Sequence, residues 1–284
     1  MKRLVPALVL LLLSFRVASA EPAIWEVRSP TARVYLFGTM HLLPKHVDWF
    51  TGKVSAAFAD SSVVFEEADI GFDKPEIFSH IMNQAVSPDY DLWQSLPDKV
   101  GAKLRKLVQS CHLPANVVAH FRPWFAAQLP TVCAIMNENH GAGSMLGPES
   151  TLIKQARATG KRMDFFETAE QQIGYLSGAS EKAQIEQLEQ EIDEGGGDNF
   201  SGMETAWFTG DVPSIAKLME KMRSQSTEFY NTLILHRNER FAARIADMLN
   251  GHDTVFVAIG AGHLAGPDSV QVLLAKQGVV SKRL

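Results

Sequence analysis

The chain contains only two cysteines, Cys111 and Cys133, among 284 residues. They do not have the spacing of a metal-binding motif, so the sequence does not indicate a cysteine-based metal centre. If the protein is exported, the two thiols can form a disulfide that closes a modest loop and stabilises the fold by about 3 kcal/mol. Two buried free thiols are the alternative, because the sequence does not supply the geometry of the pair.

Excess positive charge and long apolar segments are also missing. The formal net charge is −5, from 27 Lys and Arg against 32 Asp and Glu. Binding to phosphate groups needs a basic face, so this balance argues against nucleic acid as the main partner. A membrane-spanning helix needs about 20 apolar residues, and no run of that length follows the first residues. We therefore expect no membrane span in the mature chain.

The first twenty residues, MKRLVPALVLLLLSFRVASA, predict a secretory signal peptide. Lys2 and Arg3 precede an apolar run from Val5 to Leu13, and small residues lead to Ala20. The apolar run is too short for a membrane anchor. We expect cleavage after Ala20, a mature chain of residues 21–284, and a location in a periplasm or outside the cell.

Strand-like segments lie toward both ends of the mature chain, and helical patterns dominate its middle. Short apolar runs rich in β-branched or aromatic residues predict strands at Ile24–Val27, Val34–Phe37, Val63–Phe65, Met163–Phe166, Thr254–Ile259, and Val279–Val280 with the residues that follow. Such unbroken apolar runs are typical of strands covered on both faces. We predict an α/β fold with a central sheet from both chain ends. A large, mainly helical insertion would form a cap, roughly 74–145 and 168–250.

The helical patterns have identifiable ends. They predict helices at Lys45–Asp60, Pro97–Gln109, Pro123–Met136, Glu149–Ala158, Ser180–Glu194 and about Thr227–Leu249. The glycine run Gly195–Gly197 interrupts the second half of the chain and indicates a flexible loop or hinge.

Two histidines follow glycine at the ends of two predicted strands. In YLFGTMH and VFVAIGAGH, His41 and His263 each lie three residues after a glycine, Gly38 or Gly260. Ligands of α/β proteins gather outside the carboxyl ends of the strands. A glycine there lets the backbone turn sharply, so that the imidazole can be presented across the strand end. His46 is a rival candidate, although it falls in the first turn of the next predicted helix.

Carboxylates follow two further predicted strands. Glu66 and Glu67 end one strand, and Glu167 ends another. Imidazole nitrogen together with carboxylate oxygen suits Zn²⁺, Mn²⁺, Co²⁺ or Fe²⁺. Each residue alone is more often an ordinary turn or surface residue. The hypothesis of a shared site therefore depends on several such residues occupying the same topological position.

A pair of polar residues lies within the last long helical pattern. Arg237 and Asn238 occur in LHRNERFAARI, where Phe241 and Ile245 mark a buried face. An Arg followed by an Asn can supply donors to an oxyanion beside a metal. A solvated basic face is the alternative.

Taken in order, these motifs resemble the TraB/GumN family. The resemblance rests on FGTMH, the helix start LGPE at Leu146–Glu149, GKRMDFFET, LHRNERFAARI and AIGAGHLAGPDSV, and it covers about Trp25 to Arg283. That family includes secreted or membrane-tethered metalloproteases that inactivate Wnt proteins. It is similar to erythromycin esterases and to a bacterial haem-binding lipoprotein fold. The resemblance implies an α/β core with helical insertions.

The resemblance also assigns roles, residue by residue. His41 and His263 match the histidines of the paired GxxH motifs, and Glu66 matches a glutamate that closes the second core strand. These three are the implied ligands of a divalent metal (Mn, Co, Zn or Fe). Glu167 matches the glutamate of an L-E-T element and is implied as a further ligand or as the general base.

The R-N pair of the family is matched by Arg237 and Asn238, whose implied role is to steady a developing oxyanion. We therefore predict an exported, divalent-metal-dependent hydrolase that acts on a peptide or an ester. The alternatives are a haem- or metal-binding envelope protein without turnover, and an accessory protein in polysaccharide production. Haem capture favours a single histidine or tyrosine beside a broad apolar groove. A convergent cluster of two histidines and two glutamates therefore favours the hydrolase.

Overall fold

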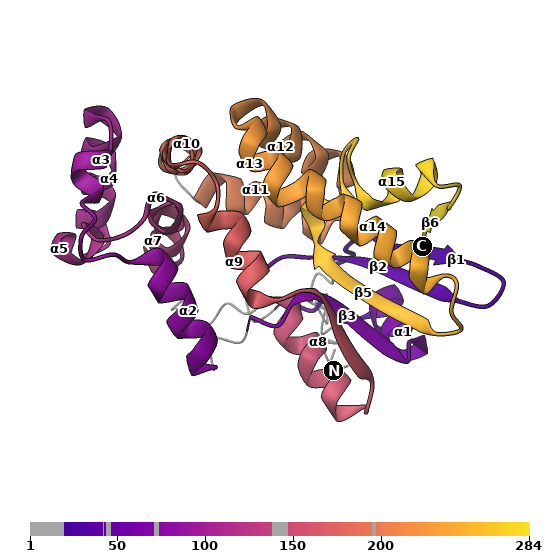
Figure 1. Cartoon of the computed structure of the whole chain (residues 1–284). Helices are drawn as coiled ribbons and strands as arrows, with labels where there is room; N and C mark the ends of the chain where they lie inside the picture. Colours follow the sequence, from indigo (N-terminus) through magenta and orange to yellow (C-terminus); the bar gives the residue numbers. More distant parts are fainter. Residues whose placement is uncertain (1–19, 42, 44–46, 71–73, 138–146, 195–196) are drawn as a thin grey trace, which may run out of the picture.

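The computed structural model describes residues 20–41, 43, 47–70, 74–137, 147–194 and 197–284 (Figure 1). Its centre is a six-stranded sheet with the strand order β4-β3-β5-β2-β1-β6. The strands are β1 (Ile24–Arg28), β2 (Arg33–Thr39), β3 (Val63–Ala68), β4 (Arg162–Glu167), β5 (Thr254–Gly260) and β6 (Ser281–Arg283). The predicted α/β class, with a sheet built from both chain ends, is confirmed.

Four neighbouring strands of the sheet are parallel. β2 pairs with β5, β5 with β3, and β3 with β4, all in the same direction. β1 and β6 complete the other side as antiparallel strands. β2, β3 and β5 are almost wholly buried, as expected for parallel strands with helices on both faces. Because these strands are parallel, their carboxyl ends lie along one edge of the sheet.

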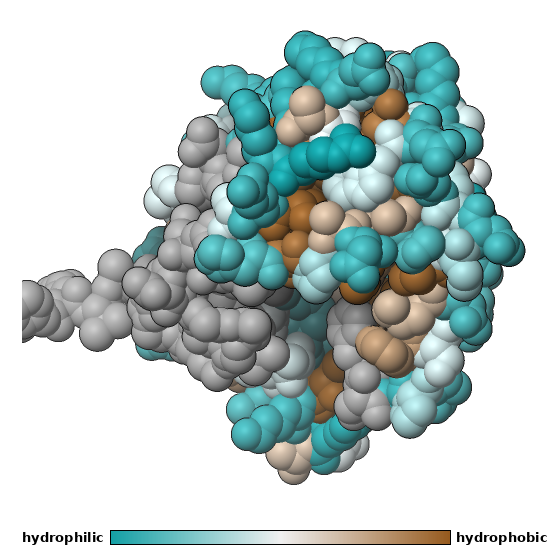
Figure 2. Space-filling model, turned by 90° about the vertical axis from the view of Figure 1, so that its left-hand side faces the viewer, coloured by the Kyte–Doolittle hydropathy of each residue, from teal (hydrophilic) through white to brown (hydrophobic). Residues whose placement is uncertain are grey.

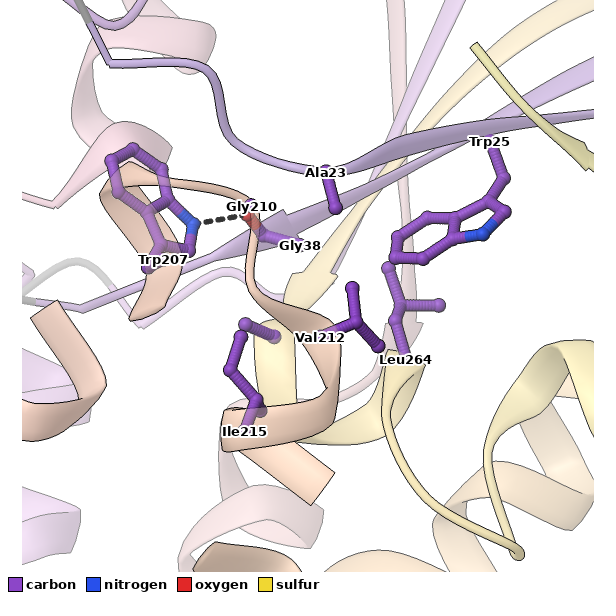
Figure 3. A pocket seen from close by; sticks show the side chains of 9 residues that line it. Ala23, Trp25, Gly38, Trp207, Gly210, Val212, Ile215 and Leu264 are labelled. Carbon is purple, nitrogen blue, oxygen red and sulfur yellow. Dashed lines mark hydrogen bonds between the residues drawn. The ribbon is translucent and has the colours of Figure 1, made fainter. Parts of the chain in front are cut away.

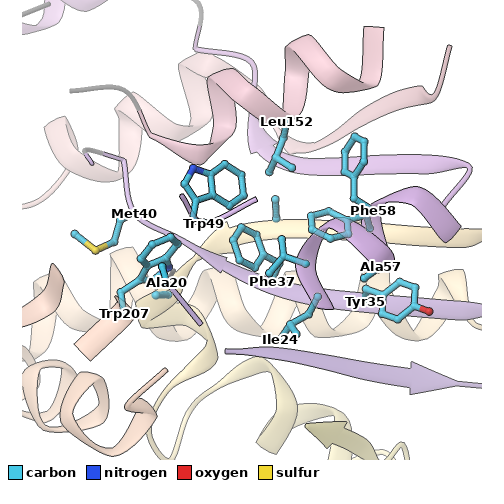
Figure 4. Close-up of a cluster of buried hydrophobic side chains, with 14 of the residues drawn as sticks. Ala20, Ile24, Tyr35, Phe37, Met40, Trp49, Ala57, Phe58, Leu152 and Trp207 are labelled. Atoms are coloured by element: carbon cyan, nitrogen blue, oxygen red, sulfur yellow. The ribbon is translucent and has the colours of Figure 1, made fainter. Parts of the chain in front are cut away.

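Two apolar layers cover the faces of the sheet. Successive residues of a strand point to opposite faces, so Phe37 and Leu36 enter different layers. On one face Phe37 stacks on Trp49 and contacts Phe256 (Figure 4). This layer also receives side chains from α1 (Gly52–Asp60), α8 (Pro148–Ala158), α11 (Gly197–Phe208) and α12 (Val212–Gln225). The other layer is formed with α14 (His236–Met248) and α15 (Val270–Lys276).

A group of helices lies beyond the carboxyl ends of the parallel strands, at the left of Figure 1. It has an apolar core of its own that includes Leu92, Leu104 and Leu188. Figure 2 faces this end and shows hydrophilic side chains with small apolar patches between them. The helices are α2 (Pro75–Ala85), α3 (Leu92–Ser95), α4 (Asp98–Ser110), α5 (Ala115–Val118), α6 (Pro123–Ala126), α7 (Leu129–Asn137), α9 (Ala169–Ser177) and α10 (Glu181–Asp193). The short helix α13 (Thr227–Tyr230) packs between this group and the sheet, against α10 and α12.

The predicted cap ranges contain this group, but they also contain three helices that belong with the sheet. Trp207 of α11 and Ile215 of α12 are buried in the first sheet layer. Phe241 and Ile245 of α14 are buried in the second. The apolar faces of these three helices pack on the strands.

Some predicted boundaries also shift, for identifiable reasons. The helix expected over Lys45–Asp60 begins only at Gly52, which has a φ of +51° and cannot continue a right-handed helix. The helix expected over Pro123–Met136 divides into α6 and α7, because Pro130 lacks the N–H needed to continue one helix. Residues 1–19 of the expected signal peptide and His46 lie outside the described residues.

The last strand begins at Ser281, two residues after the start we predicted at Val279–Val280. The N–H of Val279 donates to the carbonyl of Leu274 and closes the end of α15, so the chain enters the sheet later. β4 lies at the sheet edge and is more exposed than the covered strand we predicted. Within the described ranges, no helix is both long and apolar enough for a membrane span.

Cys111 and Cys133 form a disulfide that connects the end of α4 to α7. The bond closes a loop with a sequence separation of 22 residues inside the cap. Both cysteines are buried, as either alternative allows, and the bond between their sulfurs decides for the disulfide.

We expect the double variant Cys111→Ser/Cys133→Ser to lose about 3 kcal/mol of unfolding free energy, because its unfolded chain is less constrained. Urea denaturation of the oxidised wild type and the variant measures the difference. Reductant should destabilise the wild type by a similar amount and leave the variant unchanged. Equal stability of variant and oxidised wild type would contradict the prediction.

Candidate functional site

The strand ends that carry the candidate residues are neighbours in the sheet. β2 lies beside β5, with Thr39 opposite Gly260. β3 lies on the other side of β5, and β4 lies beyond β3. One edge of the sheet therefore carries the elements that supply His41, Glu66, Glu167 and His263.

The two glycine–histidine turns leave the sheet in contact with each other. A Cβ placed on Gly38 would lie 3.1 Å from the Cα of Ala261, so glycine allows the close approach of the first turn to the second. β5 continues directly into the 3₁₀-helix η2 (Ala261–Leu264), which carries His263. His263 is buried. The sequence motif thus corresponds to one compact backbone arrangement made from both chain ends.

Both ring nitrogens of His263 have defined partners. Nδ1 lies 2.6 Å from Oδ1 of Asn238, and Nε2 lies 3.1 Å from Nη1 of Arg237. The amide oxygen only accepts and the guanidinium only donates, so the ring carries its proton on Nδ1 and its lone pair on Nε2. Burial lowers the pKa of His263 to about 4, which agrees with a neutral ring. Asn238 is oriented in turn, because its Nδ2 donates to the carbonyl of Asp268 at 2.7 Å.

Arg237 uses all five of its N–H donors inside the protein. Nε donates to both oxygens of Glu167 at 3.1 Å, and Nη2 donates to Glu167 at 2.9 Å and to Glu67 at 2.6 Å. Nη1 donates to His263 and to the carbonyl of Leu233. A π-helical turn, η1 (Asn231–Leu235), precedes the residue. Arg237 therefore joins the ends of β3 and β4 to η2.

These contacts bear on the roles implied for the R-N pair. Arg237 is 5 % exposed and Asn238 is 0 % exposed, and their donors already bind protein groups. Contact with an oxyanion requires at least one of these hydrogen bonds to be exchanged. Glu167 is also buried and bound by Arg237, so its action as a base requires a similar exchange. Arg237 contacts Glu167, whereas the side chain of Asn238 contacts His263. The catalytic roles of the three residues stay predictions.

Glu67 is the site residue to which the sequence analysis assigned no role. Its carboxylate accepts hydrogen bonds from the N–H of Gly260 at 2.5 Å and from Gln172 at 2.8 Å, besides that from Arg237. Burial alone would raise its pKa, but the charge of Arg237 and the other partners lower the pKa of Glu67 to about 2. The only sequence signal for a role of Glu67 was its position beside Glu66 at the end of β3. The pattern did not indicate which of them pairs with an arginine 170 residues away.

Glu66 has a different environment from its neighbour. Its side chain is buried, and its Oε1 has no hydrogen-bond partner among the described residues. Burial raises the pKa of Glu66 to about 8, and the charges of Glu149 and Asp69 act in the same direction. A buried polar atom without a partner is costly, so an unpaired carboxyl oxygen is a common feature of sites that take a cation or transfer a proton.

His41 is held by a carboxylate from another part of the chain. Its Nδ1 lies 3.0 Å from Oε1 of Glu149, in the first turn of α8, and this bond raises the pKa of His41. The side chain is 71 % exposed. The charge of Glu67 also raises the pKa of His41, and that of His41 lowers the pKa of His263.

The predicted ligand set has suitable chemistry but is not drawn together in this arrangement. Within the described ranges, no three His, Cys, Asp or Glu side chains form a group that could hold a metal ion. However, His41 and His263 are each held through Nδ1, as is usual for metal-binding histidines with an outer partner. Glu66 adds an unpaired oxygen. The set His41, Glu66 and His263 stays a prediction.

A small apolar cavity lies behind the two turns (Figure 3). Its volume of about 10 Å³ is room for roughly one water molecule. Trp207 closes one side, with its Nε1 donating to the carbonyl of Gly38 at 2.7 Å. The lining residues are Ala23, Trp25, Gly38, Trp207, Gly210, Val212, Ile215, Ala261 and Leu264. None of them is titratable, so this cavity is separate from the candidate site.

Comparison with known proteins places the chain in a family. A model of the TraB/PrgY/gumN family matches residues 23–283. The chain belongs to the TraB/PrgY/gumN family. A protein from Nematostella vectensis named "Metalloprotease TIKI homolog" is 37 % identical over 79 residues, or 26 % of this chain. The match covers 17 % of that relative's length. No solved structure matches.

In this TraB/PrgY/gumN protein, Arg237→Gln should reduce the unfolding free energy by about 3–5 kcal/mol, since it leaves buried Glu67 and Glu167 without their counter-charge. Arg240→Gln is the matched control. The Arg240 side chain is 49 % exposed and 3.4 Å from Glu167, so its loss should change stability by less than about 1 kcal/mol. Urea denaturation at neutral pH compares them, and equal effects would contradict the prediction.

The ion pair of Glu67 with Arg237 should also affect how the stability of this protein changes in acid. Its pKa of about 2 lies below the ordinary value of 4.5, so the unfolded chain takes up the proton first as the pH falls. The stabilisation is complete above pH 4.5 and declines toward pH 2. We expect the stability difference between wild type and Glu67→Gln, measured by urea denaturation, to shrink from pH 5 to pH 3. A constant difference would rule out this ionised pair.

Proposed function

We propose that this protein is an exported, divalent-metal-dependent hydrolase that acts on a peptide or ester bond. The observation that carries the proposal is the pair of imidazoles from opposite chain ends, each held through Nδ1 at one edge of the sheet. The unpaired oxygen of Glu66 supports it. Membership of the family supports it as well, together with the partial likeness to a relative named as a metalloprotease.

In this proposal His41, Glu66 and His263 hold the cation. A divalent cation supplies Lewis-acid polarisation of the scissile carbonyl and makes water a nucleophile near neutral pH. The candidate ligands are two imidazole nitrogens and a carboxylate oxygen, a donor set that suits Zn²⁺, Mn²⁺, Co²⁺ or Fe²⁺. On His263 the lone pair of Nε2 now accepts from Arg237, so this bond must be exchanged when the cation binds.

The remaining residues keep this arrangement in place. Asn238 fixes the tautomer of His263, and Glu67 and Glu167 hold Arg237 beside it. If the Nη1 donor of Arg237 leaves Nε2, it is available to a developing oxyanion, which is the role that the R-N pair implies. Glu167 lies in contact with Arg237 and is our candidate for the general base.

The test uses protein purified after expression of the full chain, loaded separately with Zn²⁺, Mn²⁺, Co²⁺ or Fe²⁺. We expect His41→Ala and His263→Ala to lose bound metal, and to lose hydrolysis of a peptide and ester panel by roughly 100-fold or more. His120→Ala is the control, because His120 lies in the cap and bonds to the carbonyl of Tyr90. Elemental analysis and the rate of hydrolysis are the readouts.

The outcomes separate the proposal from its alternatives. Metal retained by both histidine variants would remove the shared site. Metal lost from both, with no turnover by the wild type, would favour a metal-binding envelope protein. The N-terminus of the secreted protein, read by sequencing, tests cleavage after Ala20.

A further inference from the structure

We infer that Glu149 is a positioning residue, which holds Nδ1 of His41 so that Nε2 is the nitrogen turned to the candidate site. The value of this orientation for cation binding rests on the proposed function, whereas the orientation itself does not. In the sequence, Glu149 is the last residue of the LGPE helix start and has no predicted role. His41 and Glu149 are 108 residues apart and meet where the start of α8 lies against the backbone of His41.

The first observation is the hydrogen bond itself. Oε1 of Glu149 lies 3.0 Å from Nδ1 of His41. A carboxylate only accepts, so the shared proton is on Nδ1 when the carboxyl is ionised. A neutral ring held in this way has its lone pair on Nε2. Carboxylate–histidine pairs of this kind orient metal ligands in many proteins.

The second observation is that backbone contact, rather than two flexible side chains, sets the geometry of the pair. A Cβ on Gly147 would meet Oε2 of Glu149 itself, and it would lie 2.5 Å from the carbonyl oxygen of His41 and 2.8 Å from its carbonyl carbon. A residue with a side chain there would push the start of α8 away from the turn. Pro148 follows at the first helical position with its φ already suited to a helix, so Glu149 is carried on a rigid support.

The third observation distinguishes this pair from an ordinary surface ion pair. His263 reaches the same edge from the other end of the chain, and its Nδ1 is also the held nitrogen, bound to Asn238 at 2.6 Å. The start of α8, which carries Glu149, lies against the backbone of His41 at this edge. Glu149 therefore lies beside the candidate ligands, although its side chain is 25 % exposed.

The test compares Glu149→Ala, Glu149→Gln and Gly147→Ala in protein expressed from the full chain. Imidazole ¹⁵N and ¹³C shifts of His41, recorded without metal at a pH where the ring is neutral, report which nitrogen carries the proton. We expect protonation on Nδ1 in the wild type and a shift toward Nε2 in Glu149→Ala and Gly147→Ala. Glu149→Gln should keep much of the wild-type state, because its amide oxygen can still accept from Nδ1.

The second readout is affinity for Zn²⁺ and Co²⁺, measured by titration. Glu149→Ala should bind 10- to 100-fold more weakly, roughly the loss expected on removing an outer partner of a ligand, with partial recovery in Glu149→Gln. Glu76→Ala is the matched control, since Pro75 and Glu76 begin α2 as Pro148 and Glu149 begin α8, and Glu76 is exposed. Unfolding curves confirm that the variants fold.

Each outcome decides the inference. A His41 ring that keeps the same tautomer in Glu149→Ala would overturn it, whatever metal does. Glu149→Gln behaving like Glu149→Ala in both readouts would reduce the pair to a charge effect and would also overturn it. A tautomer change in a protein that binds no metal would support the inference and reject the proposed function, so the two failures are distinguishable.

Discussion

The guanidinium of Arg237 is the constraint on which the arrangement of the site depends. One buried cation pairs with the carboxylates at the ends of two neighbouring strands and donates to the imidazole that follows a third. A buried charge is tolerable only when its partners are close and its donors are satisfied, and here every donor has an acceptor. The strand ends β3 and β4 are therefore tied to η2 at the point where the parallel strands leave the sheet.

The two histidines differ in burial and in the number of partners that hold them. His263 is buried, neutral and held by two fixed partners, while His41 is exposed and held by one carboxylate. In both rings the orienting partner binds Nδ1. The nitrogen farther from the backbone, Nε2, is thus the one that each turn offers to the site, and on His263 it is now covered by Arg237. Glu66 lies among these groups with an oxygen that no described residue satisfies.

Several parts of this structure could be predicted because they depend on short-range patterns. Unbroken apolar runs indicated the buried strands, with only the last one displaced, because Val279 closes the preceding helix. The convergence of strand ends followed from the parallel arrangement. The helix before β3 was predicted too long. The amphipathic spacing extends to residues before Gly52, but the left-handed φ of Gly52 prevents the helix from including them. The pairing of Cys111 with Cys133 could not be predicted, because it depends on how two helices of the cap lie together.

By itself, the sequence determined the α/β class, the membership of the family and the positions of histidine and glutamate at strand ends, because these follow from local composition and order. Tertiary structure alone decided that Glu67 rather than Glu66 pairs with Arg237, that Asn238 holds His263, and that Glu149 holds His41. These contacts join residues 25, 108 and 170 positions apart. No local pattern encodes them, since each results from the packing of a helix or turn against a strand distant in sequence.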